Sequence, residues 1–219
     1  EIRNPLSAIS LNVELMADEM AALPEERRRE VEPLLTTILG GVDRLNAITE
    51  EYLSFARLPP MEVRETSLQE VFHRIGQLMK PDLERHDVTL HIDLGEDFPG
   101  VAGDGHQLGQ VFLNLVRNSQ DAMPNGGEIR VSGQANAEGV VVTVADTGVG
   151  IPEKSLAKIF DPFFTTKDSG TGLGLAYVEQ VLLEHRARII CKSKVGEGTQ
   201  FRITFPPASQ RPGHFRKGR

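Results

Sequence analysis

Apolar residues within positions 1–57 recur in alternating steps of three and four residues. This repeat of about 3.5 residues is typical of the seam of a helical hairpin or coiled coil. We therefore predict two long helices joined near Pro24, because proline followed by acidic residues suits a helix start. Gly40 and Gly41 are expected to interrupt the second helix and mark a bend. The seams consist of Ile2, Leu6, Ile9, Val13, Met16 and Met20, and of Val31, Leu35, Ile38, Val42, Leu45, Thr49 and Tyr52.

A single hairpin buries two continuous seams poorly, whereas a pair of hairpins buries them together as a four-helix bundle. A homodimer through the hairpin at residues 1–58 is therefore expected. Pro59 and Pro60 end the second helix, because proline does not continue the hydrogen-bond ladder, and we place the domain boundary there.

From residue 61 onward the pattern changes to alternating strands and helices. Near the end of the chain, Phe201, Ile203 and Phe205 alternate with polar residues, as in a strand with one buried face. We expect an α+β chain in which residues 61–206 form a two-layer α/β sandwich, with helices on one face of a mixed sheet. The predicted helices span 67–85, 104–123 and 172–185, and the predicted strands lie near 61–66, 88–94, 128–132, 140–145, 188–192 and 199–205.

The predicted helix at 104–123 has one apolar face and one polar edge. Asn114, Asn118 and Asp121 recur at helical spacing and form the edge. Amide and carboxylate oxygens beside a buried face suit a hydrated divalent cation such as Mg²⁺, which keeps several waters when phosphates supply other ligands. The apolar face consists of Leu108, Val111, Phe112, Leu115 and Ala122.

Two glycine clusters lie about twenty residues apart, each beside a predicted regular element. Together with the polar helix edge they predict a nucleotide pocket closed by a short lid. The second cluster opens a helix, where free N–H groups and the helix dipole favour phosphate. The chain contains no Gly-x-x-x-x-Gly-Lys-Ser/Thr loop, which excludes a P-loop enzyme. The segments read Asp146-Thr-Gly148-Val-Gly150, then Phe160-Asp-Pro-Phe163-Phe-Thr-Thr-Lys167, then Gly170-Thr171-Gly172-Leu173-Gly174.

These motifs resemble those of the sensor histidine kinases of two-component systems. The run Asn114-Leu-Val-Arg-Asn118-Ser-Gln-Asp121 is similar to the N box of that family. The segments at 146–150, 160–163 and 170–175 resemble its G1, F and G2 boxes, and Glu1-Ile-Arg-Asn4-Pro-Leu resembles its H box. Order and spacing match from residue 1 to about 206.

The resemblance implies ATP and Mg²⁺ as cofactors. Asp146 is expected to read the adenine amino group, Asn118 to bind the metal, and Asn114 to support it or orient water. Arg117 and Lys167 are candidate phosphate contacts. The remaining nucleotide contacts expected are Asp121, Gly148, Gly150, Phe160, Gly170, Thr171, Gly172, Leu173 and Gly174.

The H box implies a phosphoacceptor histidine directly before Glu1, where this chain begins. In the family the glutamate takes the proton of that histidine, and the residue at Asn4 orients water in the reverse, phosphatase reaction. None of the six histidines precedes a similar run. The chain as written is therefore hypothesised to bind Mg·ATP without phosphorylating itself at the usual position. A response regulator with an acceptor aspartate is the expected partner.

Two other classes stay open at this point. A related ATPase of the gyrase, mismatch-repair or heat-shock chaperone type uses a glutamate at the position of Asn114 to activate water, and an amide is a poor base. A non-catalytic dimeric module, such as a pseudokinase, would bind nucleotide without phosphoryl transfer. The hairpin argues against the first class and the intact glycine clusters argue against lost nucleotide binding.

Composition adds a few limits. The length of 219 residues indicates one or two domains. The net charge of −7 indicates no general attraction to nucleic acid. Cys191 is the single cysteine, so we expect a buried strand residue in a reducing compartment. With no apolar run of membrane-spanning length, no signal peptide and no initiator Met, we expect a cytoplasmic fragment of a longer protein. Residues 207–219 are expected to form a basic, disordered tail.

Overall fold

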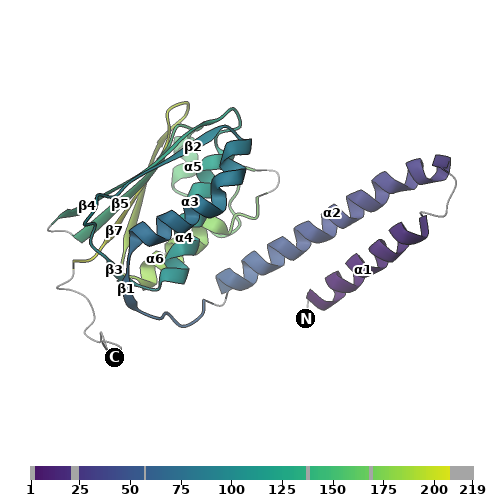
Figure 1. The fold of residues 1–219 in the computed structure, drawn as a ribbon, viewed down its shortest axis with the longest axis horizontal. Helices are drawn as coiled ribbons and strands as arrows, with labels where there is room; N and C mark the ends of the chain where they lie inside the picture. Colours follow the sequence, from purple (N-terminus) through teal and green to yellow (C-terminus); the bar gives the residue numbers. More distant parts are fainter. Residues whose placement is uncertain (1–2, 21–24, 57, 137–138, 168–169, 208–219) are drawn as a thin grey trace. The chain divides into compact units, whose positions relative to one another are not determined.

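A computed structural model describes residues 3–20, 25–56, 58–136, 139–167 and 170–207 (Figure 1). The chain divides into two compact units, residues 1–57 and 58–219. Glu1, the predicted connection near Pro24 and all of the predicted tail at 207–219 except Pro207 lie outside the described residues.

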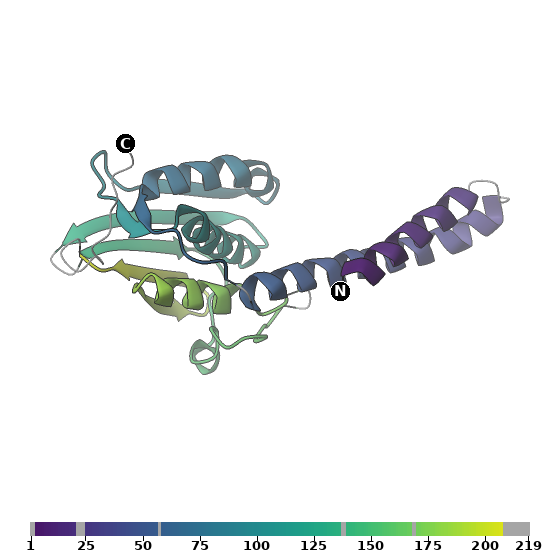
Figure 2. The ribbon, with the colours of Figure 1, turned by 90° about the horizontal axis from the view of Figure 1, so that it is seen from below.

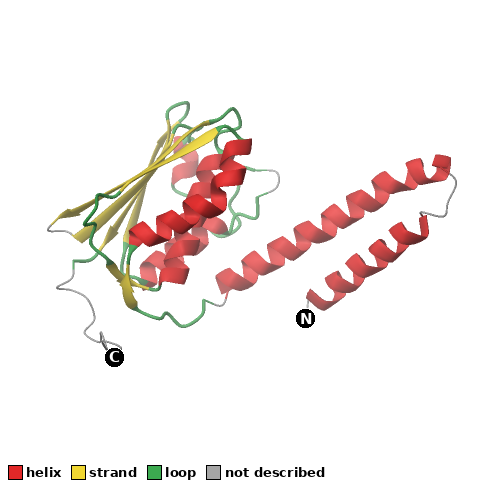
Figure 3. Ribbon diagram, viewed as in Figure 1, coloured by secondary structure: helices red, strands yellow, loops and turns green. Residues whose placement is uncertain are grey.

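The first unit is a hairpin of two helices, α1 (Arg3–Met20) and α2 (Glu25–Ala56) (Figures 1 and 3). Val13, Met20 and Leu35 form its buried core, with Val31 and Leu39 packed against them. The predicted seams divide into two sets, because alternate seam positions face away from this core. The exposed set consists of Ile9, Met16, Ile38, Leu45 and Tyr52.

The predicted interruption at Gly40 and Gly41 is wrong, since α2 is a single helix that continues through both residues. Each glycine costs an exposed helix about 1 kcal/mol relative to alanine. Leu35 and Val42, which are buried on either side of the pair, hold the helix together across it.

The second unit is an α/β sandwich. Its five-stranded sheet has the order β2-β4-β5-β7-β6, in which β2 and β4 are parallel and the other neighbours are antiparallel. Helices α3, α4 and α6 lie together on one face of this sheet, as the second layer (Figures 1 and 3). The elements are β1 (Arg64–Thr66), α3 (Leu68–Arg85), β2 (Val88–Asp93), β3 (Val101–Gly103), α4 (Gly105–Asp121), β4 (Gly127–Asn136), β5 (Gly139–Asp146), α5 (Glu153–Leu156), α6 (Gly174–Glu184), β6 (Arg188–Lys194) and β7 (Gly198–Phe205).

Two short elements were not anticipated from the sequence. Strand β3 pairs with β1 in a separate two-stranded sheet, and α5 lies within the predicted lid. Elements of three or four residues are too short to show an alternating or helical pattern, so periodicity does not reveal them.

Helix α4 is central to the core of the second unit. Leu108, Phe112 and Leu115 are each fully buried. The ring of Phe112 lies 4.5 Å from that of Phe72 on α3, measured between centroids. The side chain of Asp104 begins α4 by accepting hydrogen bonds from two first-turn N–H groups. Burial of the apolar face thereby determines which way the polar edge of α4 points.

No helix within the part of the chain that the structure describes is long and apolar enough to cross a membrane.

Replacing Gly40 with alanine is expected to stabilise α2 by about 0.5–1 kcal/mol, because a Cβ at this position meets no atom within 4 Å. Hydrogen exchange of the α2 amides would measure the change. Gly109→Ala in α4, where a Cβ also meets nothing within 4 Å, is the matched control and should protect only the second unit. Faster exchange in α2 after Gly40→Ala would mean that the helix needs a bend there.

Candidate nucleotide-binding site

The polar edge of α4 faces the segment that links β5 to α6. The amino group of Lys167 donates hydrogen bonds to Asn118 Oδ1 at 3.1 Å and to Asp121 Oδ2 at 2.7 Å. One turn earlier, Asn114 Nδ2 donates to the carbonyl of Gly174 at 3.4 Å. The structure therefore brings the three predicted edge residues against the predicted lid and the start of α6. Arg117 lies exposed on the same helix.

Asp146 ends β5 with a carboxylate that is nearly buried. Oδ1 accepts hydrogen bonds from the N–H groups of Gly148 at 3.0 Å and Thr199 at 3.1 Å. Oδ2 accepts one from the hydroxyl of Ser119 at 3.0 Å. Burial raises the pKa of Asp146 above its ordinary value, although these three donors oppose the shift. Oδ2 has remaining acceptor capacity, as an ionised carboxylate oxygen with one donor does.

Ser119 and Thr199 were missed by sequence reasoning. Ser119 adjoins Asn118, so its place in the polar edge motif was an available signal. Thr199 carried no such signal, because its contact with Asp146 depends on the register between β5 and β7, which pairs the two residues.

Glycine is required at two points where the lid is attached. Gly150 has φ +73° and a Cβ there would lie 2.1 Å from the carbonyl oxygen of Lys194. Gly172 has φ +71° and a Cβ would lie 2.4 Å from the carbonyl carbon of Phe163. Both positions combine a left-handed backbone with close backbone contact, which only glycine accommodates without strain. The two glycine clusters therefore hold the two ends of the lid.

The lid extends away from the sheet and helix layers and contains α5 (Figure 2). Its second half is closed by a hydrogen bond from the N–H of Phe163 to the carbonyl of Gly172, at 3.0 Å. Phe163 is 62% exposed, whereas Phe160 is half-buried. The N–H of Gly170 bonds to the carbonyl of Lys167 at 3.2 Å.

Helix α6 begins directly after the second glycine cluster. Leu173 is fully buried, and its N–H bonds to the hydroxyl of Thr171 at 3.3 Å. As the N-cap residue of α6, Leu173 makes no side-chain capping bond to the first turn. The first-turn N–H groups of a helix without such a cap are suited to an anion. Gly174, the first residue of α6, lies beside Asn114 of α4.

The predicted residues of the first unit are less fully placed. Asn4 lies in the first turn of α1, where the structure describes its backbone, and Glu1 lies outside the described residues.

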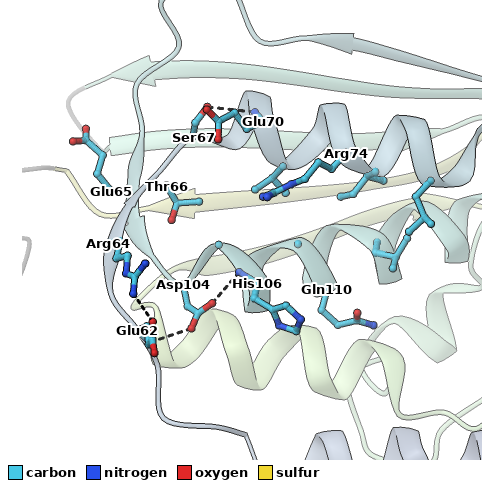
Figure 4. A pocket seen from close by; sticks show the side chains of 16 residues that line it. Glu62, Arg64, Glu65, Thr66, Ser67, Glu70, Arg74, Asp104, His106 and Gln110 are labelled. Carbon is cyan, nitrogen blue, oxygen red and sulfur yellow. Dashed lines mark hydrogen bonds and ion pairs between the residues drawn. The ribbon is translucent and has the colours of Figure 1, made fainter. Parts of the chain in front are cut away.

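A separate groove of about 610 Å³ lies between α3, α4 and β1 (Figure 4). Glu70, Arg74 and Gln110 are among its lining residues, and none of the residues predicted to contact nucleotide lines it. At its lower end Figure 4 shows Asp104 bonded to Glu62 and His106. The candidate nucleotide site and this groove are therefore on different parts of α4.

The fold and site define a nucleotide-binding α/β domain that follows a helical hairpin. Residues 103–209 match the family described as histidine kinase-, DNA gyrase B- and HSP90-like ATPase. Residues 1–60 match the His Kinase A (phospho-acceptor) domain. The chain belongs to the sensor histidine kinases, with a phosphoacceptor region and an ATP-binding domain.

Curated relatives agree with this assignment. The chain is 33% identical over 207 residues to sporulation kinase A of Bacillus subtilis, covering 94% of this chain and 33% of the relative. It is 32% identical over 206 residues to the sensor histidine kinase ZraS of Escherichia coli K12, covering 94% of this chain and 43% of the relative. The chain thus spans less than half the length of these relatives.

Solved structures share the architecture. Full-length ShkA in complex with AMPPNP has a TM-score of 0.77 and 25% identity, over 95% of this chain and 44% of that one. The histidine kinase ThkA in complex with the response regulator TrrA has a TM-score of 0.65 and 25% identity, and the match covers 96% of this chain and 61% of that chain. The catalytic domain of ThkA alone is 30% identical with a TM-score of 0.61, and the match covers 66% of this chain and 97% of that chain.

Cys191 is a half-buried residue of β6 and is expected to be a poor nucleophile. Burial, followed by the nearby charge of Asp146, raises the pKa of its thiol to about 11. Alkylation at pH 7.5 should therefore be about 100-fold or more slower than that of free cysteine, because only the thiolate reacts. Timed labelling of the native and urea-unfolded chain would test this, with unfolding restoring the ordinary rate. Equal rates in both states would contradict the burial of the thiol.

Proposed function

We propose that this chain is the catalytic core of a sensor histidine kinase. It transfers the γ-phosphoryl group of ATP to a histidine, and from there to an aspartate of a response regulator. The observation that carries the proposal is the meeting of three features around one lid. These are the nearly buried carboxylate of Asp146, the amide edge at Asn114 and Asn118, and the start of α6 at Gly174.

Asp146 selects adenine in this proposal. Its Oδ2 accepts a hydrogen bond from the exocyclic amine of adenine, a contact that the carbonyl of guanine is unable to make. The N–H groups of Gly148 and Thr199 keep the carboxylate oriented. Ser119 holds the second oxygen toward α4. Three donors also offset part of the cost of burying the anion.

Magnesium fits the same edge of α4. Asn118 Oδ1 and Asp121 Oδ2 already converge on one positive charge, the ammonium group of Lys167. Asn118 is the proposed protein ligand of Mg²⁺, and Asp121 interacts with the ion or its waters. When bound, Mg²⁺ neutralises the charge of the phosphoryl oxygens during transfer. Released from Asn118 and Asp121, Lys167 contacts phosphate, as does Arg117.

The other nucleotide contacts follow from the attachment of the lid. The first-turn N–H groups of α6 bind phosphate, and Gly170, Thr171, Gly172 and Leu173 shape the approach to them. Gly150 anchors the opposite end of the lid against the β6–β7 turn, where the N–H of Gly196 bonds to the carbonyl of Val149 at 2.9 Å. Phe160, which is half-buried within the lid segment, is proposed to limit water at the site.

The hairpin supplies the phosphoacceptor half of the reaction. In this proposal the acceptor is a histidine at the position directly before Glu1, as the H box requires, and Glu1 takes its proton. Asn4, one turn along α1, orients water when the same site dephosphorylates the regulator. The exposed seam residues of the hairpin are covered by a second copy of the chain in a dimeric four-helix bundle. We place this part of the parent protein in the cytoplasm.

Asp146→Asn should weaken ATP binding about 10- to 100-fold, the effect of losing a charge-assisted hydrogen bond. The fold should persist, since the asparagine oxygen can still accept from Gly148 and Thr199. Calorimetry with Mg·ATP and Mg·GTP would measure the loss. Ser119→Ala, which keeps the carboxylate, is the control and should retain the preference for ATP. Undiminished ATP affinity in Asp146→Asn would remove Asp146 from adenine recognition.

Transfer of labelled γ-phosphate from Mg·ATP tests the whole proposal. The chain extended by one histidine before Glu1 should gain an acid-labile label, because a nucleophile then lies where the H box requires it. The chain without that histidine, and the extended chain with Asn118→Ala, should stay unlabelled. If the extended chain binds nucleotide and takes no label, the function is that of a binding or phosphatase module instead.

A further inference from the structure

His185 is a buried histidine that none of the proposed chemistry uses. It lies directly after α6 and is 5% exposed. Its Nδ1 donates to the carbonyl of Val181 at 2.7 Å, and its Nε2 accepts from the N–H of Asp104 at 3.0 Å. A carbonyl only accepts and a backbone N–H only donates, so the ring is neutral with its proton on Nδ1. Both ring nitrogens are thus committed to the backbone of two different elements.

The ring fits closely against the chain that leads into α4. A Cβ on Gly103 would lie 2.6 Å from His185 Cδ2 and 2.8 Å from Leu108 Cδ1. On its other side the carbonyl of Gly103 accepts a hydrogen bond from the hydroxyl of Thr66, at 2.9 Å. The strand pair β1–β3 and the ring of His185 therefore hold the same residue from two directions.

Asp104, which His185 contacts, is the residue that begins α4. Its Oδ1 accepts from the N–H of His106 at 2.9 Å and its Oδ2 from the N–H of Glu62 at 3.0 Å (Figure 4). Oδ1 also accepts from the N–H of Gln107 at 3.1 Å. Burial acts to raise the pKa of Asp104, but these donors outweigh it and the pKa is lowered. The carboxylate stays ionised at neutral pH and caps the helix.

Helices α4 and α6 are joined at two points. His185 joins the end of α6 to the start of α4, and Asn114 joins the middle of α4 to the start of α6. The two helices are therefore antiparallel neighbours, and a shift of one along the other changes the distance from Asn118 to the first turn of α6.

We propose that His185 is a positioning residue, whose neutral ring keeps α4 and α6 in the register that nucleotide binding requires. The inference rests on the proposed function, since it concerns the ATP affinity of that site. His185 touches neither nucleotide nor metal in this role and acts only through the backbone of Asp104.

The charges around His185 define the pH dependence. Burial lowers its pKa below the ordinary 6.5, although the bond to Val181 and the carboxylates of Asp104 and Glu184 oppose this. Tyr177, on the same face of α6, has a pKa raised by burial and by the same two carboxylates, so it remains neutral. A lowered pKa means that the folded state binds fewer protons. The contribution of His185 to the free energy of unfolding is therefore fully present above pH 6.5, and it is lost as the pH falls below that value and the ring becomes protonated.

The test measures the affinity for Mg·ATP of wild type, His185→Gln and His185→Asn in the full chain. It is made at pH 7.5 and at a lower pH at which nitrogen NMR shows the His185 ring of wild type to be protonated. Glutamine can place an oxygen where Nε2 accepts from Asp104, and it does not titrate. Asparagine reaches only the level of Nδ1, next to Val181. Thermal unfolding of each variant at both pH values confirms that folded protein is being compared.

At pH 7.5, His185→Gln should bind within about twofold of wild type, and His185→Asn about fivefold more weakly, the factor for one ordinary hydrogen bond. Between pH 7.5 and the lower pH at which the ring is protonated, wild type should lose about fivefold more affinity than His185→Gln. Protonation of Asp146 affects both chains alike and cancels in this comparison. Nitrogen NMR of the ring should show the proton on Nδ1 at pH 7.5.

An equal loss of affinity with falling pH in wild type and His185→Gln would overturn the positioning role, as would a protonated ring at pH 7.5. Either result leaves the proposed function intact if wild type binds Mg·ATP at pH 7.5. Absence of that binding in wild type would overturn the proposed function, and this inference with it.

Discussion

The rotation of helix α4 about its own axis is the constraint on which the site depends. Its apolar side chains are fully buried, and turning the helix would expose them at about 25 cal/mol for each Å² of apolar surface. Side chains on one helix keep fixed angles to one another, so burying Phe112 and Leu115 also directs Asn114 and Asn118 toward the lid. Hydrophobic packing thus positions polar groups that contribute little to the core themselves.

Strong and weak polar contacts are distributed in a way that suits binding. Asp146 is nearly buried and has three donors, so its orientation is retained whether or not a ligand is present. The pair Lys167–Asp121 has side chains that are 39% and 55% exposed, and such pairs contribute about 0–1 kcal/mol. A cation or phosphate can displace Lys167 at small cost. The end of the site proposed to read the base is therefore rigid, and the end proposed to bind phosphate is adjustable.

In the hairpin, the local sequence pattern predicted the helices correctly but not the course of the second one. The heptad repeat predicted two helices correctly, and the structure divides the seam residues between a buried set around Val13 and Leu35 and an exposed set around Ile38 and Leu45. The expected break at Gly40 and Gly41 was wrong because helix propensity is a local preference of about 1 kcal/mol per residue, which packing on both sides overrides.

The sequence by itself determined the type and order of the long elements and the motifs at Asn118, Asp146 and Gly172, because periodicity and spacing are local properties. Only the tertiary structure decided the partners of those motifs. The N–H of Thr199 donates a hydrogen bond to Asp146, which lies 53 positions away in the sequence. The N–H of Asp104 donates one to His185, which lies 81 positions away. Such contacts depend on strand register and on how two helices pack. Strand register and helix packing leave no repeating pattern in the sequence, because each is determined by the burial of surfaces that are distant along the chain.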